Sequence, residues 1–269
     1  RINDGYFVQS NINARPINFG PACGTEGAPA FPACTPRLAY PHLLVRTDLP
    51  VPVYQVITQT DFETLGFTNG RQPDTRFFRY YEVAGGAHNV VHRNVQLVPA
   101  GVLRPGPVLL EDLCREEINS TTDGPVFVAH VLNALWTRMA QQADEGKRPP
   151  AGQVMDLVDG VLARDARGNV TGGVRVPALE VPVATYVSGN VADPDLPPAL
   201  AGIGSLVCRL SGSVFPLDAE TLGALYPNHR QYLKQVKASV ATLQEQGLLL
   251  RADAAAIVRE TERSGVGRN

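Results

Sequence analysis

Three short runs of apolar, β-branched and aromatic residues predict β-strands in the first third of the chain. They cover residues 5–10, 51–57 and 76–83, and the last run contains four aromatic residues. Such residues favour a pleated, buried backbone, and Pro or Gly residues at the borders mark where the runs start or end. We therefore expect a strand at each place, with the second and third strands ending in polar turns.

Helical periodicity dominates the middle and the end of the chain. Asp123 can cap a helix that has Pro125 in its first turn and ends near Gly146. The apolar residues of this helix recur at helical spacing, and they are Phe127, Val131, Leu132, Leu135, Trp136 and Met139. Further helices are expected at residues 38–45, 219–225 (capped by Asp218), 230–246 and 254–258.

Between the helical parts, residues 154–187 change period. Their alternating apolar segments flank the turn at residues 166–169, and this pattern predicts a β-hairpin or meander. Beyond residue 263 we expect a frayed tail, because terminal residues lack packing partners unless they dock on the domain.

Composition and charge exclude several classes of protein. The 269 residues carry a formal net charge of −2 and no basic stripe, which argues against nucleic-acid binding. No apolar run is long enough to cross a bilayer, so no membrane span is expected. The 25 Gly and 22 Pro residues exceed the usual share and predict many loops between the periodic segments.

The four cysteines suggest a disulfide more than a metal site. No C-x-x-C motif is present, so zinc and thioredoxin chemistry have no support. Cys23 and Cys34 lie in a loop rich in Pro and Gly, which a local disulfide would stabilise; two buried free thiols fit the sequence equally well. A disulfide there would indicate an extracytoplasmic protein, periplasmic or secreted.

An acid and a His follow the second and third predicted strands. Asp61 stands just past the run that ends in Thr-Gln-Thr, and His88 follows a tight turn made possible by Gly85 and Gly86. In a hydrolytic triad a His takes the proton of the nucleophile, and a carboxylate orients the imidazole ring. Catalytic groups of open α/β sheets gather at the carboxyl ends of strands. We predict that Asp61 and His88 form such a pair, with Glu63 as the alternative acid.

Plainer interpretations of these residues remain open from spacing alone. An Asp after a strand and a His after Gly-Gly are both ordinary in surface turns. His88 and His92 have the spacing of two ligands on a helix, but the sequence supplies no accompanying Glu or third ligand. We therefore predict neither a metal site nor a cofactor.

Several motifs resemble those of a bacterial family, the alpha/beta hydrolase domain-containing proteins. In chain order they are R-Q-P-D-T at 71–75, E-V-A-G-G-A-H at 82–88, T-D-G-P at 122–125, G-G-V-R-V-P-A-L-E-V-P at 172–182, C-R-L-S-G-S at 208–213 and L-Y-P at 225–227. The resemblance spans most of the chain. It implies Asp61 as the acid of a catalytic triad and His88 as its base.

The resemblance also implies an architecture. We expect an α/β fold in which residues 1–150 form the C-terminal part of an α/β-hydrolase core. Residues 151–269 would add a β-hairpin and a helical extension packed on the same core.

The nucleophile of the triad is missing from the sequence. The hydrolase fold carries its Ser in a G-x-S-x-G motif ahead of the acid and the His, and no such motif occurs here. The nearest fragments, at 202–205 and 211–213, follow the His and lack the pattern. We expect the chain to be the C-terminal portion of a longer hydrolase, with the Ser upstream or on another chain.

These observations support two hypotheses. The first is a serine hydrolase that cleaves a small-molecule carboxylic ester through an acyl-enzyme, with His88 as base and Asp61 as orienting acid. The alternative is a non-catalytic binding or structural module with a decayed hydrolase core. An enzyme requires the Asp61 carboxylate to face His88, whereas a binding module leaves it turned away.

Overall fold

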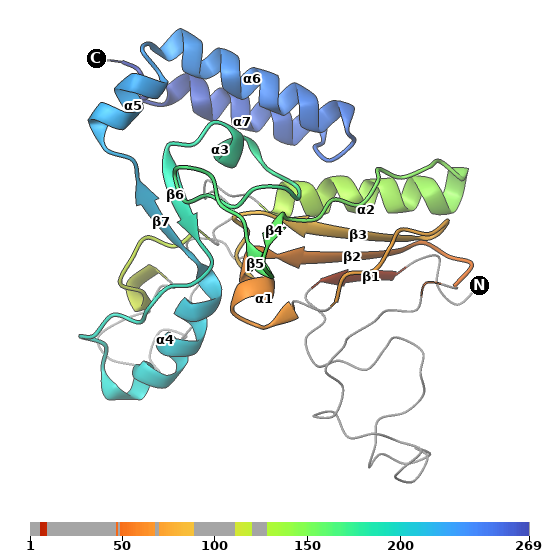
Figure 1. The fold of residues 1–269 in the computed structure, drawn as a ribbon, viewed down its shortest axis with the longest axis horizontal. Helices are drawn as coiled ribbons and strands as arrows, with labels where there is room; N and C mark the ends of the chain where they lie inside the picture. The colour runs from red at the N-terminus through yellow and green to blue at the C-terminus, as the bar shows by residue number, and fades with distance from the viewer. Residues whose placement is uncertain are drawn as a thin grey trace, which may run out of the picture.

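The computed structural model describes residues 6–9, 47, 49–67, 70–88, 111–119 and 128–268. Figure 1 shows their arrangement. The elements are, in chain order, β1 (Tyr6–Gln9), β2 (Val53–Thr58), α1 (Gln59–Glu63), β3 (Phe78–Val83), η3 (Glu111–Leu113), α2 (Val128–Glu145), β4 (Leu157–Val158), β5 (Val161–Leu162), α3 (Pro177–Glu180), β6 (Ala184–Val187), α4 (Pro198–Ser211), β7 (Ser213–Pro216), α5 (Ala219–Leu225), α6 (His229–Glu245) and α7 (Arg251–Arg263).

The three predicted N-terminal strands are confirmed, and they form one parallel sheet in the order β1–β2–β3. Tyr6 pairs with Val53, and Val53 pairs with Phe78. All six residues of β2 and all six of β3 are buried, as expected of parallel strands covered on both faces. Because the strands are parallel, the segments that follow β2 and β3 leave the sheet at the same edge.

Side chains of β2 and β3 alternate between two apolar clusters. On one face, Tyr54 and Tyr81 belong to the main core, which includes Leu135 of α2 and Val240 of α6. On the other face, Ile57 and its neighbours form a smaller cluster. The main core contains residues from both sides of residue 150. The division of the chain into two parts at that position stays a prediction.

The C-terminal half adds a helical layer and a second small sheet. Helices α6 and α7 pack side by side above α3 (Figure 1), and β6 pairs antiparallel with β7. Helix α4 lies at the far end of the β6–β7 ribbon from α5 and α6 (Figure 1). Among the described residues, no helix combines the length and the apolar character needed to span a bilayer.

Several predicted helices are confirmed, and one of them has the predicted cap. Asp218 caps α5 by accepting a hydrogen bond from Thr221 N at 2.7 Å, and α6 buries Tyr232, Val236, Val240 and Leu243. Helix α2 ends before Gly146 as predicted. Asp123, Pro125 and the helix expected at 38–45 lie outside the described residues.

One member of the predicted apolar stripe of α2 was placed wrongly. Trp136 is 52 % exposed, while Val131, Leu135 and Met139 are buried. The buried positions of α2 recur at spacings of three and four residues, at Val128, Val131, Leu135 and Met139, and Trp136 lies one position past Leu135, outside this stripe.

The meander predicted at 154–187 is confirmed only for its first part. Strands β4 and β5 pair antiparallel, and bridges join Met155 to Gly172 and Arg164 to Val170. Beyond them the prediction was wrong, since Pro177 starts the short helix α3 and β6 pairs with β7. Pro favours the first helical turn, and the partner of β6 lies too far along the chain for local patterning to indicate it.

The predicted fraying of the tail was also wrong for the described residues. His229 N donates to the Gly267 carbonyl at 2.8 Å, and His229 Nδ1 lies 2.9 Å from the Val266 carbonyl. The tail therefore folds back onto the start of α6.

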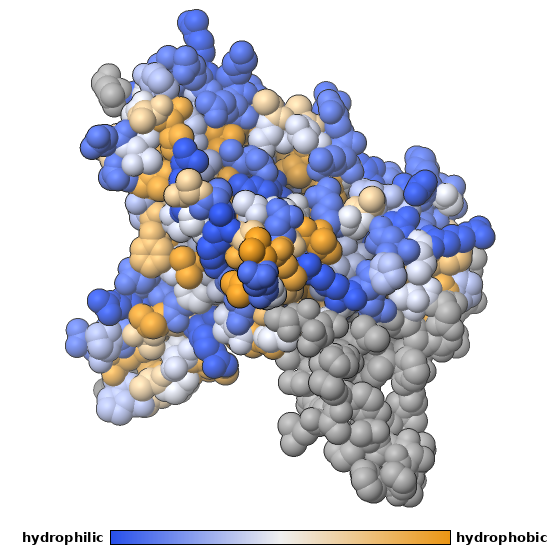
Figure 2. All heavy atoms as spheres, in the orientation of Figure 1, coloured by the Kyte–Doolittle hydropathy of each residue, from blue (hydrophilic) through white to orange (hydrophobic). Residues whose placement is uncertain are grey.

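Among the described residues, the β4–β5 hairpin carries the two most exposed large apolar side chains. Val158 and Val161 are 63 % and 68 % exposed, and Figure 2 shows an apolar group at the position of this hairpin. The two strands are joined by a type I′ turn, since its central residues, Asp159 and Gly160, both have positive φ.

Candidate active site

The carboxyl ends of β2 and β3 meet at one edge of the sheet and carry the two predicted site residues. Helix α1 starts directly after β2 and contains Asp61, and a turn after β3 leads to His88. Thr58 and Val83, the last residues of the two strands, are paired in register. The geometry therefore brings together two residues that are 27 positions apart in the sequence.

A capping box fixes the Asp61 carboxylate. Thr58 is the N-cap of α1, and Asp61 is its third helical residue. Asp61 Oδ2 accepts hydrogen bonds from the Thr58 backbone N–H at 2.7 Å and from the Thr58 hydroxyl at 2.8 Å. In return, Asp61 N donates to the Thr58 hydroxyl oxygen at 3.2 Å, and this reciprocal pair of contacts satisfies backbone donors at the start of the helix and locks the side chain. Asp61 is fully buried, and its Oδ2 atom is anchored at the start of α1.

The second carboxylate oxygen faces His88. Asp61 Oδ1 lies 2.6 Å from His88 Nδ1. A carboxylate only accepts, so Nδ1 carries the proton, and the neutral ring then has its lone pair on Nε2. The His88 side chain is 25 % exposed, whereas Asp61 is not exposed at all. The ring is thus oriented from the buried side and remains accessible from outside.

Hydrogen bonds from two neighbouring segments fix the turn that carries His88. Gly85 N donates to Gln59 Oε1 of α1 at 2.8 Å, and Asn119 Nδ2 donates to the Gly85 carbonyl at 3.0 Å. Gly85 has a φ of 67°, a backbone conformation that residues other than glycine rarely adopt. These contacts define the position of His88 relative to α1, and Gln59 and Asn119 were not predicted as site residues.

The chain matches a family model described as an alpha/beta hydrolase domain over residues 1–259. The chain belongs to this family. Neither curated proteins nor solved structures gave a match.

Family membership agrees with the mixed α/β architecture of this alpha/beta hydrolase domain. The described part comprises a parallel three-stranded sheet with α2 on one face, and small sheets and helices in the C-terminal half.

The alternative acid of the hydrolase domain has other partners. Glu63 is exposed and accepts hydrogen bonds from Gln59 at 2.9 Å and from Arg164 at 2.6 Å. Asp61 is therefore the carboxylate of α1 that contacts His88. Within the described ranges there is no group of three or more His, Cys, Asp or Glu side chains arranged to hold a metal, and His92 lies outside them.

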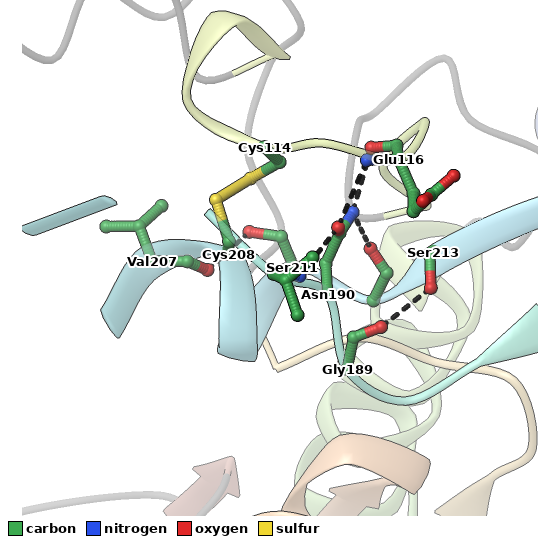
Figure 3. Close-up of a disulfide and its surroundings, with 10 residues drawn as sticks. Cys114, Glu116, Gly189, Asn190, Val207, Cys208, Ser211 and Ser213 are labelled. Carbon is green, nitrogen blue, oxygen red and sulfur yellow. Dashed lines mark hydrogen bonds between the residues drawn. A yellow bond between two sulfur atoms is a disulfide. The ribbon is translucent and has the colours of Figure 1, made fainter. Parts of the chain in front are cut away.

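A disulfide stabilises the segment of the hydrolase domain that leads to Asn119. Cys114 and Cys208 are joined across 94 residues, tying the segment after η3 to α4 (Figure 3). Asn190 adds a clamp, because its amide donates to the Glu116 carbonyl at 2.9 Å and accepts from Glu116 N at 3.3 Å. Asn119, five residues after Cys114, is the residue that bonds the His88 turn.

This disulfide was not predicted, and the predicted pair Cys23 and Cys34 lies outside the described residues. Sequence spacing alone does not reveal which of four cysteines pair.

Arg71 and Asp74 fix the loop between β2 and β3. Arg71 makes two hydrogen bonds to the buried Glu82 carboxylate, at 2.8 Å and 2.7 Å, and one to the Met155 carbonyl. Asp74 accepts from Gly152 N at 2.8 Å. Their contacts join the loop to β3 and to the start of the C-terminal half.

Replacing Arg71 with Met is expected to lower the free energy of unfolding by about 3 kcal/mol, because it leaves a fully buried Glu82 carboxylate without its cation. Urea unfolding of the native protein measures the loss. Arg76→Met, an exposed site in the same segment, is the matched control and should change little. Equal midpoints for the two variants would contradict the assigned role of the pair.

Proposed function

We propose that this protein is a serine hydrolase that cleaves a small-molecule carboxylic ester through an acyl-enzyme. Family membership supports hydrolase activity in general. The observation that carries the finer proposal is the 2.6 Å contact between His88 Nδ1 and a buried Asp61 carboxylate held in a capping box. Such a pair holds the imidazole in the tautomer that a general base requires.

In the proposed mechanism, His88 moves protons and Asp61 keeps its charge throughout. His88 Nε2 accepts the proton of a Ser hydroxyl as its oxygen attacks the ester carbonyl carbon. The imidazolium formed is stabilised by Asp61 Oδ1 and returns the proton to the departing alcohol. A water molecule then gives its proton to Nε2 and attacks the acyl-enzyme, releasing the carboxylic acid and restoring the Ser hydroxyl.

The Ser and the oxyanion-hole donors are proposed to come from a part of the protein outside these 269 residues or from another chain. This assignment rests on the absence of a G-x-S-x-G motif from the sequence. We also propose an extracytoplasmic location, because the Cys114–Cys208 disulfide is typical of oxidising compartments.

A non-catalytic binding or structural module, the alternative, would also lack the G-x-S-x-G motif. The site geometry argues against that alternative. Asp61 faces His88, whereas a decayed site has no need to keep a buried charge oriented toward an accessible imidazole.

The test is the intact mass of the native protein before and after reaction with a fluorophosphonate probe. The proposal expects one adduct, carried by a protein or complex that exceeds the 28.9 kDa of these residues. Pretreatment with a serine-blocking sulfonyl fluoride should prevent the adduct. No adduct on a protein that contains the upstream segment would overturn the proposal and leave the binding module.

A further inference from the structure

A second concave site lies away from His88, in the helical layer. It is a cavity of about 260 Å³ lined by residues of α2, α3, β6, α6 and α7. Neither His88 nor Asp61 lines it. Its volume exceeds the roughly 150 Å³ of an engineered apolar cavity that accommodates benzene. A single ring with a short substituent therefore fits in it.

The walls of this cavity are mainly apolar. They include Val131 of α2, Ala178 of α3, Val236 of α6 and Ile257 of α7, together with several other Val and Leu side chains. Apolar walls with a few polar groups are the usual lining of small-molecule sites. These apolar walls favour a ligand that consists mainly of hydrocarbon.

Tyr186 of β6 supplies a buried polar group in this wall. Its side chain has no exposed surface, and within the part of the chain that the structure describes its hydroxyl has no hydrogen-bond partner. The nearby Tyr226, which does not line the cavity, satisfies its hydroxyl on the Pro182 carbonyl at 2.9 Å. A buried hydroxyl left without a partner costs free energy, so a ligand acceptor reaching Tyr186 would relieve that cost.

The charges around the cavity disfavour an anionic ligand. Glu260 lines it, and the Asp253 carboxylate lies 3.1 Å from His130, another lining residue. Burial lowers the pKa of His130, and the Asp253 charge only partly opposes that effect. Burial also raises the pKa of Tyr186, which keeps its hydroxyl protonated as a donor. The lining thus offers the neutral Tyr186 hydroxyl as a donor beside negative charge.

We propose that this cavity binds a small uncharged apolar molecule, such as a monocyclic ketone, whose carbonyl accepts a hydrogen bond from Tyr186. The hydrocarbon part lies among the Val and Leu side chains of the helices. The site is independent of the proposed ester hydrolysis, and its test does not measure that activity.

The experiment compares three probes of similar size by calorimetric titration of the native protein. Acetophenone carries the carbonyl, ethylbenzene lacks it, and benzoate carries a negative charge. We expect acetophenone to bind most tightly and benzoate at least about tenfold more weakly, since its charge faces Glu260. Absence of acetophenone binding, or tighter binding of benzoate, overturns the proposal.

Variants then locate the bound probe. Tyr186→Phe should weaken acetophenone binding about three- to tenfold, the value of one neutral hydrogen bond, and leave ethylbenzene unchanged. Tyr226→Phe is the matched control and should leave both affinities unchanged. Ala178→Leu, at a partly exposed position of the wall, should weaken both probes. An unchanged acetophenone affinity in Tyr186→Phe, or in Ala178→Leu, would show that the probe binds elsewhere.

A stability measurement separates this role of Tyr186 from a structural one. Because none of the residues that the structure describes bonds this hydroxyl, Tyr186→Phe should not lower the thermal unfolding midpoint. Tyr226→Phe loses a hydrogen bond and should lower it. A lower midpoint for Tyr186→Phe would overturn the assignment of its hydroxyl to a ligand.

Discussion

Replacing Asp61 with Asn is expected to slow ester hydrolysis by the native protein about 10⁴-fold in kcat, with little change in KM. The Asn amide would still meet Thr58 through its oxygen and would turn its NH₂ group toward His88. His88 Nδ1 would then have to accept a hydrogen bond, which moves the ring proton to Nε2. A protonated Nε2 cannot take a proton from the nucleophile.

The control for this substitution is Glu63→Gln, at the end of the same helix. Glu63 is bonded to Gln59 and Arg164, so its replacement should leave the rate near that of the native protein. The measurement is the steady-state rate with a chromogenic ester, with circular dichroism to confirm folding of both variants. A rate for Asp61→Asn within tenfold of the native rate would exclude Asp61 as the orienting acid.

Removal of the Cys114–Cys208 disulfide has the second largest expected effect. The double variant Cys114→Ser, Cys208→Ser should lose about 4 kcal/mol in free energy of unfolding, because the bridge restricts a long loop in the unfolded chain. The loss is measured by urea unfolding monitored by circular dichroism. The slope of that transition should rise, since an unfolded chain without the bridge exposes more surface.

The neighbouring residue Arg115 provides the comparison for this experiment. Its side chain is 65 % exposed, so Arg115→Ala alters the same segment without touching the bridge. We expect its unfolding midpoint to stay close to that of the native protein. If the double Ser variant unfolds at the same urea concentration as Arg115→Ala, the disulfide contributes nothing to stability.

Strand composition and strand order carried most of the information about the candidate site. The β-branched and aromatic residues of β2 and β3 indicated both strands, and parallel pairing brings their carboxyl ends together. The Thr58-x-x-Asp61 spacing was also visible in the sequence, and it resembles a capping box with Asp in place of Glu. That signal could have revealed how Asp61 is anchored.

Features that depend on distant contacts were beyond sequence reasoning. Asn119 meets Gly85 across 34 positions, and the pairing of β6 with β7 joins segments separated by the whole of α4. The cavity around Tyr186 draws its walls from five elements. No local pattern specifies such contacts, because each residue involved looks ordinary among its own neighbours.

The Cys114–Cys208 bridge turns the middle of the chain into a covalent ring. The ring contains α2, the β4–β5 hairpin, α3 and β6, and so it holds much of the main core. A single proteolytic cut between the two cysteines would open this ring without separating the chain into two pieces. A nicked molecule would therefore keep its mass, apart from one added water, until a reductant releases the fragments.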